Sequence, residues 1–173
     1  MQNPKEHKSI ALTMTILAWA VFLVLAVVYF NDVFEKQHNP NQAPSTTYSA
    51  ENSREVVLQR NRYGHYVTTG RINGKAVTFL LDTGATGVAL SDTTARRLGL
   101  KRGRPFQTST ANGISTSYAV KLDSVSVGAI ALQDVPAGIS PGLGMDEVLL
   151  GMSFLKHIEF TQRGNKLILR QYL

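Results

Sequence analysis

Residues 10–30 constrain the fold of this chain more than any other feature. They include no charged residue, no proline and no glycine. At about 1.5 Å per residue, a helix of this length crosses the roughly 30 Å hydrocarbon core of a bilayer. A buried core helix of this length usually carries a polar stripe, and a cleaved signal peptide has a shorter apolar region followed by a small-residue cleavage site. We therefore expect residues 10–30 to form an uncleaved transmembrane anchor.

The charges that flank this run predict its orientation. Lys5 and Lys8 precede it, and only Lys36 follows it closely. Because positively charged flanks stay in the cytoplasm, residues 1–9 are expected to be cytoplasmic and the rest of the chain to lie outside the cytoplasm.

The overall composition excludes several classes of site. There is no cysteine, so disulfides, a thiolate nucleophile and Cys-ligated zinc are all excluded. The formal net charge is +6 at pH 7. However, the densest basic stretch, residues 96–104, lacks the interleaved aromatic residues that a nucleic-acid surface uses for stacking. We expect no nucleic-acid partner.

After the apolar run, the composition changes twice. Residues 31–55 are polar and rich in Asn, Gln, Pro, Ser and Thr, which is typical of a flexible linker. Residues 56–173 contain short runs of β-forming residues separated by turn residues, and they are numerous enough to build one core. We predict a small, mostly β domain over residues 56–173.

Turn residues predict where the strands of this domain pair. Asn73-Gly74 between two extended runs is a strong hairpin signal, and further hairpins are expected over residues 106–120, 124–132 and 158–170. Residues 91–98 resemble a helix that Ser91 or Asp92 caps and Gly99 ends. Residues 148–150 form a short apolar run followed by one or two helical turns.

One acidic residue stands where a carboxylate is suited to chemistry. Two leucines lead directly into Asp82, which Thr83 and Gly84 follow. An acid at the end of an apolar strand, on a glycine-containing turn, is rigidly held and partly desolvated. Asp-Thr-Gly is also good turn chemistry, so an isolated triplet would by default be read as a structural Asx turn.

Three segments in order give the triplet its context. Residues 80–85 hold it, a predicted hairpin has residues 110–113 at its tip, and Leu149-Leu150-Gly151 lies about 67 residues after Asp82. With these segments, the chain resembles the retropepsin-like aspartic proteases, and more closely their small membrane-anchored bacterial members. The resemblance covers roughly residues 63–173. It implies a mainly β fold, a closed acid-protease barrel with one lobe per chain, after the N-terminal transmembrane helix.

The resemblance also implies an endopeptidase that uses neither cofactor nor metal. In such a site two aspartates share one proton, so that one activates water and the other polarises the scissile carbonyl. Asp82, Thr83 and Gly84 would form the catalytic turn, with Thr83 tying together the two turns of a dimer. The expected substrate-binding residues are Ala85, Thr86, Ala111, Asn112 and Gly113. Retroviral members usually carry a second acid at the Thr86 position, so their subsite preferences do not transfer.

The Asp-Thr-Gly triplet occurs once in the sequence, and this predicts an oligomeric state. A two-aspartate site then needs two chains related by a two-fold axis. We expect a homodimer whose chains pair through residues 166–173 and 56–58. The bacterial resemblance places it as a single-pass inner-membrane protein with a periplasmic C-terminal domain, acting on polypeptides.

Other motifs predict no chemistry of their own. Residues 138–142 match a Gly-x-Ser-x-Gly nucleophile elbow, but Pro141 lacks the N–H that the oxyanion hole requires. His65 and His157 stand without carboxylates at ligand spacing, so we interpret them as ordinary surface or core residues.

Two alternatives to a protease that acts on other proteins stay open. The domain could be a catalytically silent retropepsin-like dimerisation or binding module at the membrane, although such a module has no physical need for an intact Asp-Thr-Gly. The exposed linker over residues 31–55 could also be a site of self-processing that releases the domain.

Overall fold

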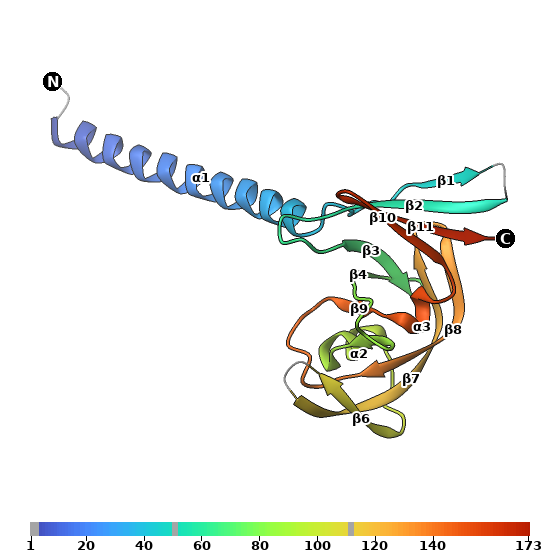
Figure 1. The fold of residues 1–173 in the computed structure, drawn as a ribbon. Coiled ribbons are helices and arrows are strands. Elements are labelled where there is room, and N and C mark those ends of the chain that lie inside the picture. Colours follow the sequence, from blue (N-terminus) through green and yellow to red (C-terminus); the bar gives the residue numbers. More distant parts are fainter. Residues whose placement is uncertain (1–3, 50–51, 111–112) are drawn as a thin grey trace. The chain divides into compact units, whose positions relative to one another are not determined.

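A computed structural model describes residues 4–49, 52–110 and 113–173, and it confirms the mainly β fold (Figure 1). The chain divides into two compact units, Met1–Gln37 and His38–Leu173. The helices are α1 (Pro4–His38), α2 (Asp92–Leu98) and α3 (Met152–Leu155). The strands are β1 (Thr46–Ser49), β2 (Ser53–Gln59), β3 (Val67–Ile72), β4 (Lys75–Leu81), β5 (Val88–Leu90), β6 (Pro105–Thr110), β7 (Gly113–Val127), β8 (Ile130–Ile139), β9 (Val148–Leu150), β10 (Glu159–Arg163) and β11 (Lys166–Tyr172).

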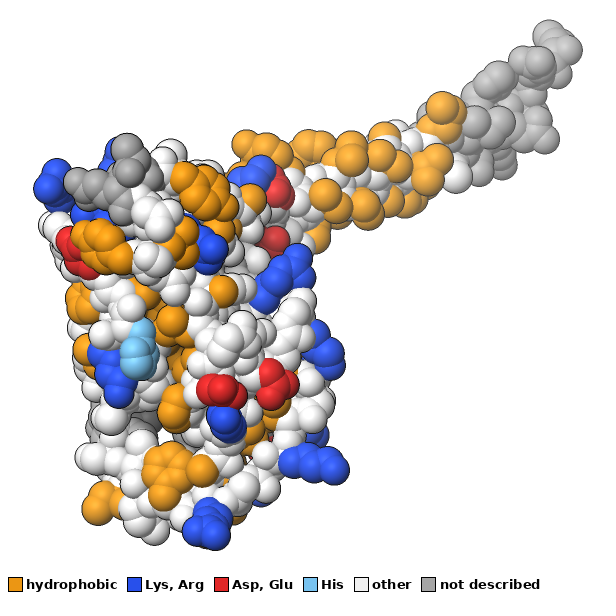
Figure 2. Space-filling model, turned by 90° about the vertical axis from the view of Figure 1, so that its right-hand side faces the viewer, with side chains coloured by type: hydrophobic (Ala, Val, Ile, Leu, Met, Phe, Trp, Pro, Cys, Tyr) orange, Lys and Arg blue, Asp and Glu red, His pale blue; other side chains and the backbone are white. Residues whose placement is uncertain are grey.

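Helix α1 contains the apolar run and extends beyond it to His38. Among the described residues it is the one helix long and apolar enough to cross a membrane, with the candidate span Leu12–His38. Its large hydrophobic side chains from Leu12 to Phe34 are exposed, and Figure 2 shows them along the face of the helix in view. A helix that is apolar all round is typical of a membrane span rather than of a helix on a globular core.

The larger sheet holds the predicted active-site turn. Within the described residues its strand order is β3-β4-β9-β5-β8-β7-β6, and β3 also pairs with β7. Because β3 and β7 pair, the sheet curves so that strands from its two ends meet. Strand β6 lies beyond this closure and, among the described strands, pairs with β7 alone. The approach of β3 to β7 depends on Gly70, since a Cβ there would lie 2.3 Å from the carbonyl oxygen of Ser126.

The predicted hairpins are present in this sheet and beside it. Asn73 and Gly74 both adopt positive φ, 50° and 78°, as a tight turn between β3 and β4 requires. The pairs β6–β7, β7–β8 and β10–β11 account for the other three hairpins. Helix α2 begins where expected, because the Ser91 hydroxyl accepts a hydrogen bond from the N–H of Thr94 at 3.2 Å.

One hydrophobic core lies between the sheets and the two short helices. Its largest fully buried side chains include Phe79 of β4, Phe154 of α3 and Leu150 of β9. Leu58 and Leu169 join the same core from the other sheet. The strand that leads to Asp82 therefore buries Val77 and Phe79 in this core, and β3 and β9 pair with its two edges.

The smaller sheet differs from what we expected of the dimer edges. Its order is β1-β2-β11-β10, so β2 and β11 pair with each other and each has a further partner. Residues 56–58 and most of 166–173 therefore lie in interior strands, and the outer strands are β1 and β10. The sequence shows that these runs form strands, but it does not show that they pair within one chain.

Residues 31–55 also differ from the expected flexible linker. They contain the end of α1, all of β1 and the start of β2. Asn39 and Asn41 are buried, each only 7% exposed. A polar segment can be buried when its side chains satisfy backbone hydrogen-bonding groups, and both asparagines do so: the Asn39 side chain accepts from the N–H of Asn41, and the Asn41 side chain bonds to Gln59 and Val67. The second compact unit therefore begins at His38, not at residue 56.

Candidate active site

Asp82 follows β4 directly, at the point where β4 runs parallel to β9. The backbone N–H of Asp82 donates to the carbonyl of Leu150 at 3.3 Å. The N–H of Gly84 donates to the Asp82 carboxylate oxygen Oδ1 at 2.8 Å, and the N–H of Ala85 donates to the Asp82 carbonyl at 3.2 Å. The carboxylate is thus oriented by its own turn, and the turn is fixed to β9.

Gly151 shows why Leu149-Leu150-Gly151 packs against the Asp82-Thr83-Gly84 turn. A Cβ at this position would lie 2.3 Å from the carbonyl oxygen of Gly87 and 2.5 Å from that of Ala85. The segment after Asp82 therefore passes directly over Gly151, and only a residue without a side chain leaves room for it. The N–H of Met152 then donates to the Ala85 carbonyl at 2.9 Å. The two motifs form one interlocked turn.

Ser153 braces the same turn, and the sequence analysis did not identify it. Its hydroxyl accepts a hydrogen bond from the N–H of Val88 at 2.9 Å and donates to the carbonyl of Pro136 at 2.8 Å. It thereby joins α3, β5 and β8 behind the candidate catalytic turn. A serine two residues after a Leu-Leu-Gly sequence is too common a pattern to reveal this role.

The predicted flap is the hairpin of β6 and β7, registered from Pro105↔Tyr118 to Thr110↔Gly113. Gly113 has φ of 106°, and Ile114 beside it is 79% exposed. Two of the expected substrate-binding residues, Ala111 and Asn112, lie outside the described residues. The structure therefore shows the stem of the hairpin on the same sheet as Asp82.

The base of this hairpin is held by a second feature that the sequence analysis missed. Arg102 donates to the Asp92 carboxylate at 3.0 Å and 2.5 Å, and its guanidinium lies 4.5 Å from the ring centroid of Tyr118 in β7. The hydrogen bond from Arg102 holds the pKa of Asp92 below its ordinary value of 3.8, against a smaller opposing effect of desolvation. The start of α2 is thereby tied to the flap stem.

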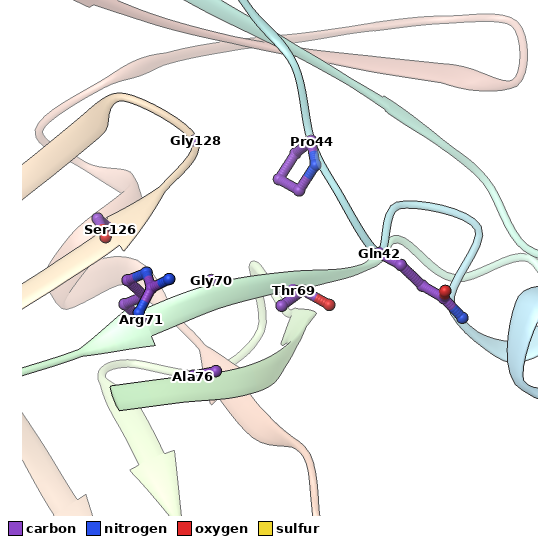
Figure 3. A pocket seen from close by; sticks show the side chains of 8 residues that line it. All are labelled: Gln42, Pro44, Thr69, Gly70, Arg71, Ala76, Ser126 and Gly128. Atoms are coloured by element: carbon purple, nitrogen blue, oxygen red, sulfur yellow. The ribbon is translucent and has the colours of Figure 1, made fainter. Parts of the chain in front are cut away.

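The residues that match a nucleophile elbow lie against the stem of the flap hairpin, where the Ser140 and Ser117 hydroxyls are 2.8 Å apart. Residues 138–142 include the last two residues of β8 and the loop after it. Among the described residues, no three His, Cys, Asp or Glu side chains gather as a metal site would require. A hollow of about 210 Å³ lies beside β3, lined by Arg71, Gln42 and Ser126 among others, and none of the candidate site residues lines it (Figure 3).

Comparisons with known proteins agree with this geometry. A model of the gag-polyprotein putative aspartyl protease family matches residues 68–157, which hold both interlocked motifs. The solved structure of a retropepsin-like aspartic protease from Rickettsia conorii is similar, with a TM-score of 0.59 and 32% sequence identity. The match covers 66% of this chain and 98% of that one.

Two curated sequences are also similar. An uncharacterized protein in the cobV 5′ region of Sinorhizobium sp is 37% identical over 135 residues, and an uncharacterized protein of Rickettsia prowazekii (strain Madrid E) is 28% identical over 165 residues. The matches cover 76% and 89% of this chain. The chain spans 58% of the length of the first relative and 69% of the second.

Proposed function

The chain belongs to the retropepsin-like aspartic protease family, and we propose that it is an aspartic endopeptidase, anchored in a membrane and active as a homodimer. The observation that carries the proposal is the interlocked turn, in which Gly151 admits the segment after Asp82 and the Gly84 N–H orients the carboxylate. A domain that only binds partners has no need for a carboxylate presented in this way.

In the proposed reaction, two Asp82 carboxyl groups, one from each chain, share a single proton. The ionised carboxylate removes a proton from water, and the oxygen attacks the carbonyl carbon of the scissile peptide. The protonated carboxyl donates its proton to the carbonyl oxygen. The tetrahedral intermediate then breaks its C–N bond as the amine leaves with a proton returned by the pair. Gly84 donates its N–H to keep the carboxylate in place, and Thr83 connects the two turns across the dimer axis.

The substrate is proposed to lie extended beneath the β6–β7 hairpin, paired with backbone as an added strand. Ala85 and Thr86 would contact it from the catalytic turn, and Ala111, Asn112 and Gly113 from the flap. The exposed Ile114 beside Gly113 is suited to cover an apolar side chain of the substrate.

The membrane anchor is proposed to be α1, with residues 1–9 in the cytoplasm and the domain from His38 outside it. Confinement of both chains to one membrane raises their effective concentration for pairing. In a bacterium this corresponds to the inner membrane and the periplasm.

The test uses full-length protein in detergent with a diverse peptide pool. Asp82→Asn should abolish cleavage while the variant stays folded by circular dichroism, and a statine-type transition-state mimic should block the wild type. Asp123→Asn is the matched control, because Asp123 is an exposed acid of β7 outside the candidate site. Cleavage that persists in Asp82→Asn contradicts the mechanism. A folded wild type that cleaves nothing supports the silent binding module instead.

A further inference from the structure

The residues immediately after α1 are bound into the protease domain by a buried asparagine clamp, formed by Asn39 and Asn41. The Asn41 side chain donates to the carbonyls of Gln59 at 2.9 Å and Val67 at 2.7 Å, and its oxygen accepts from the N–H of Gln59 at 2.7 Å. It therefore joins the end of β2 to the start of β3 with three hydrogen bonds to backbone.

The backbone of the clamp is paired as well. The carbonyl of Asn41 accepts from the N–H of Thr69 at 3.0 Å, and Asn41 forms a parallel bridge with Thr68. The Asn39 side chain donates to the Thr69 hydroxyl at 3.0 Å. Figure 3 shows the following residues, Gln42 and Pro44, continuing beside Thr69. A buried segment with this many hydrogen bonds does not act as a flexible tether.

Two sets of contacts connect the residues around the clamp to the strands that hold the catalytic turn. It is bound to β3, and the His38 side chain contacts the Glu147 carboxylate at 2.5 Å, directly before β9. Strand β4, which delivers Asp82, lies between β3 and β9. From Glu147 to Leu150 is about 10 Å of strand, and the Leu150 carbonyl accepts from Asp82. Asp82 is thus on the order of 20 Å from the end of α1.

Chain length alone then limits how far the site can reach from a bilayer, whatever the orientation of the domain. Helix α1 continues without a break from the apolar run to His38, and the clamp begins at the next residue. Eight helical residues beyond residue 30 rise about 12 Å. A 25-residue flexible linker would instead have a root-mean-square extension of about 25–30 Å and a much greater maximum.

We propose that the substrates are polypeptides anchored in the same membrane, cut in the extended stretch close to where they leave the bilayer. This inference rests on the proposed membrane-anchored protease. A site that lies within roughly 30 Å of the hydrocarbon core, whatever the orientation of the domain, is reached by an extended segment of roughly ten residues or fewer. A substrate confined to the same membrane is also presented at high effective concentration, which falls as about the −3/2 power of the tether length.

The experiment reconstitutes the full-length protein in liposomes with single-span test substrates. Each carries one cleavable sequence, placed about 30 or about 150 Gly/Ser residues beyond its span, so that the shorter tether has a root-mean-square length of about 30 Å; the same sequence is supplied as a free peptide. Because the enzyme has no flexible tether between α1 and its domain, the near substrate should be cut about 11-fold faster than the far one. Inserting about 50 Gly/Ser residues between Gln37 and His38 should reduce that ratio to about 4-fold, because both tethers then contribute.

The free peptide distinguishes the proposed protease activity from the proposed preference for membrane-anchored substrates. Its cleavage should require Asp82 and should be equal in the wild type and the insertion variant. If the free peptide is cut in this way but the near-to-far ratio is the same with and without the insertion, the substrate inference is overturned and the protease stands. If no substrate is cut in an Asp82-dependent manner, the proposed function itself fails.

Discussion

The candidate catalytic turn is determined at the scale of single residues, by hydrogen bonds from its own backbone. Asp82 accepts from Gly84 two residues later, a contact that any Asp-x-Gly turn of this shape can form. What distinguishes this turn from an ordinary Asx turn is its attachment to Leu150 and its passage over Gly151. Those contacts fix the position of the Asp82 turn against β9 and the start of α3.

Gly151→Ala tests this attachment. The new methyl group would meet the carbonyl oxygens of Gly87 and Ala85, so the turn must move or the variant must lose stability by roughly 1–3 kcal/mol. Peptide cleavage should fall further than stability, because a small displacement of Asp82 misaligns the reacting atoms.

Thermal unfolding and cleavage rates would be measured beside Gly144→Ala. Gly144 has nothing within 4 Å of a built Cβ, so this control should be close to wild type in both measurements. A Gly151→Ala variant with wild-type stability and rate would contradict the interlocked turn.

At the scale of elements, one guanidinium connects α2 to the flap stem. Arg102 lies in the connection between α2 and β6, and it contacts Asp92 on one side and Tyr118 on the other. The hydrogen bond to Asp92 also raises the pKa of Arg102, so the arginine stays charged over the whole working range. The pair therefore joins two elements that are far apart in topology but adjacent in space.

The Arg102–Asp92 pair should contribute to the free energy of unfolding in a pH-dependent way, and the variant Arg102→Gln measures that contribution. The folded-state pKa of Asp92 is lowered below 3.8, so the stabilisation is fully present above that pH and is lost as pH falls through the folded-state value. The wild type should be more stable than the variant at pH 7, and the difference should shrink in strong acid.

Urea unfolding at pH 7 and in strong acid measures the difference in free energy of unfolding between the wild type and Arg102→Gln. Arg104→Gln, a change two residues along the same connection, serves as the matched control. Its difference in stability from the wild type should be the same at both pH values. A gap between wild type and Arg102→Gln that is equal at both pH values would show that Asp92 is not the partner that matters.

At the scale of the whole molecule, the proposed activity depends on pairing. One Asp-Thr-Gly is present in the sequence, so a two-aspartate site requires a second chain. Because β2 and β11 are already paired within the chain, the strands with an open side in the described part of the smaller sheet are β1 and β10. We expect the dimer to use surfaces other than residues 56–58.

Mixing experiments measure this requirement directly. When wild type and Asp82→Asn are produced together and pair at random, activity should follow the square of the wild-type fraction, so equal amounts leave about one quarter. The double variant Asp82→Asn with Asp123→Asn should behave like Asp82→Asn alone. A linear decline, with half of the activity at equal amounts, would mean that each chain works by itself.

Local patterns were sufficient for much of the fold. The Asn73-Gly74 hairpin, the Ser91 cap of α2 and the short β9 strand are each specified by neighbouring residues, because turn geometry and capping involve contacts over a few positions. The turn of Asp82 was likewise indicated by its neighbouring residues, whereas the role of Leu149-Leu150-Gly151 as its partner followed from the resemblance to the aspartic proteases. Local patterns failed for residues 31–55, whose polarity indicates solvent exposure although Asn41 is buried.

The sequence by itself determined the apolar helix, the β-rich domain and the lone acid on its turn, because hydrophobic runs and turn residues act locally. Only the tertiary structure decided that Gly151 lies beneath the segment after Asp82, that Ser153 and Arg102 brace the candidate site, and that Asn41 binds the residues after α1 into the domain. Each of these contacts joins residues that are at least ten positions apart, and in most cases more than fifteen. A side chain that satisfies a distant backbone group leaves no periodic mark in the sequence, so its role appears only when the chain has folded.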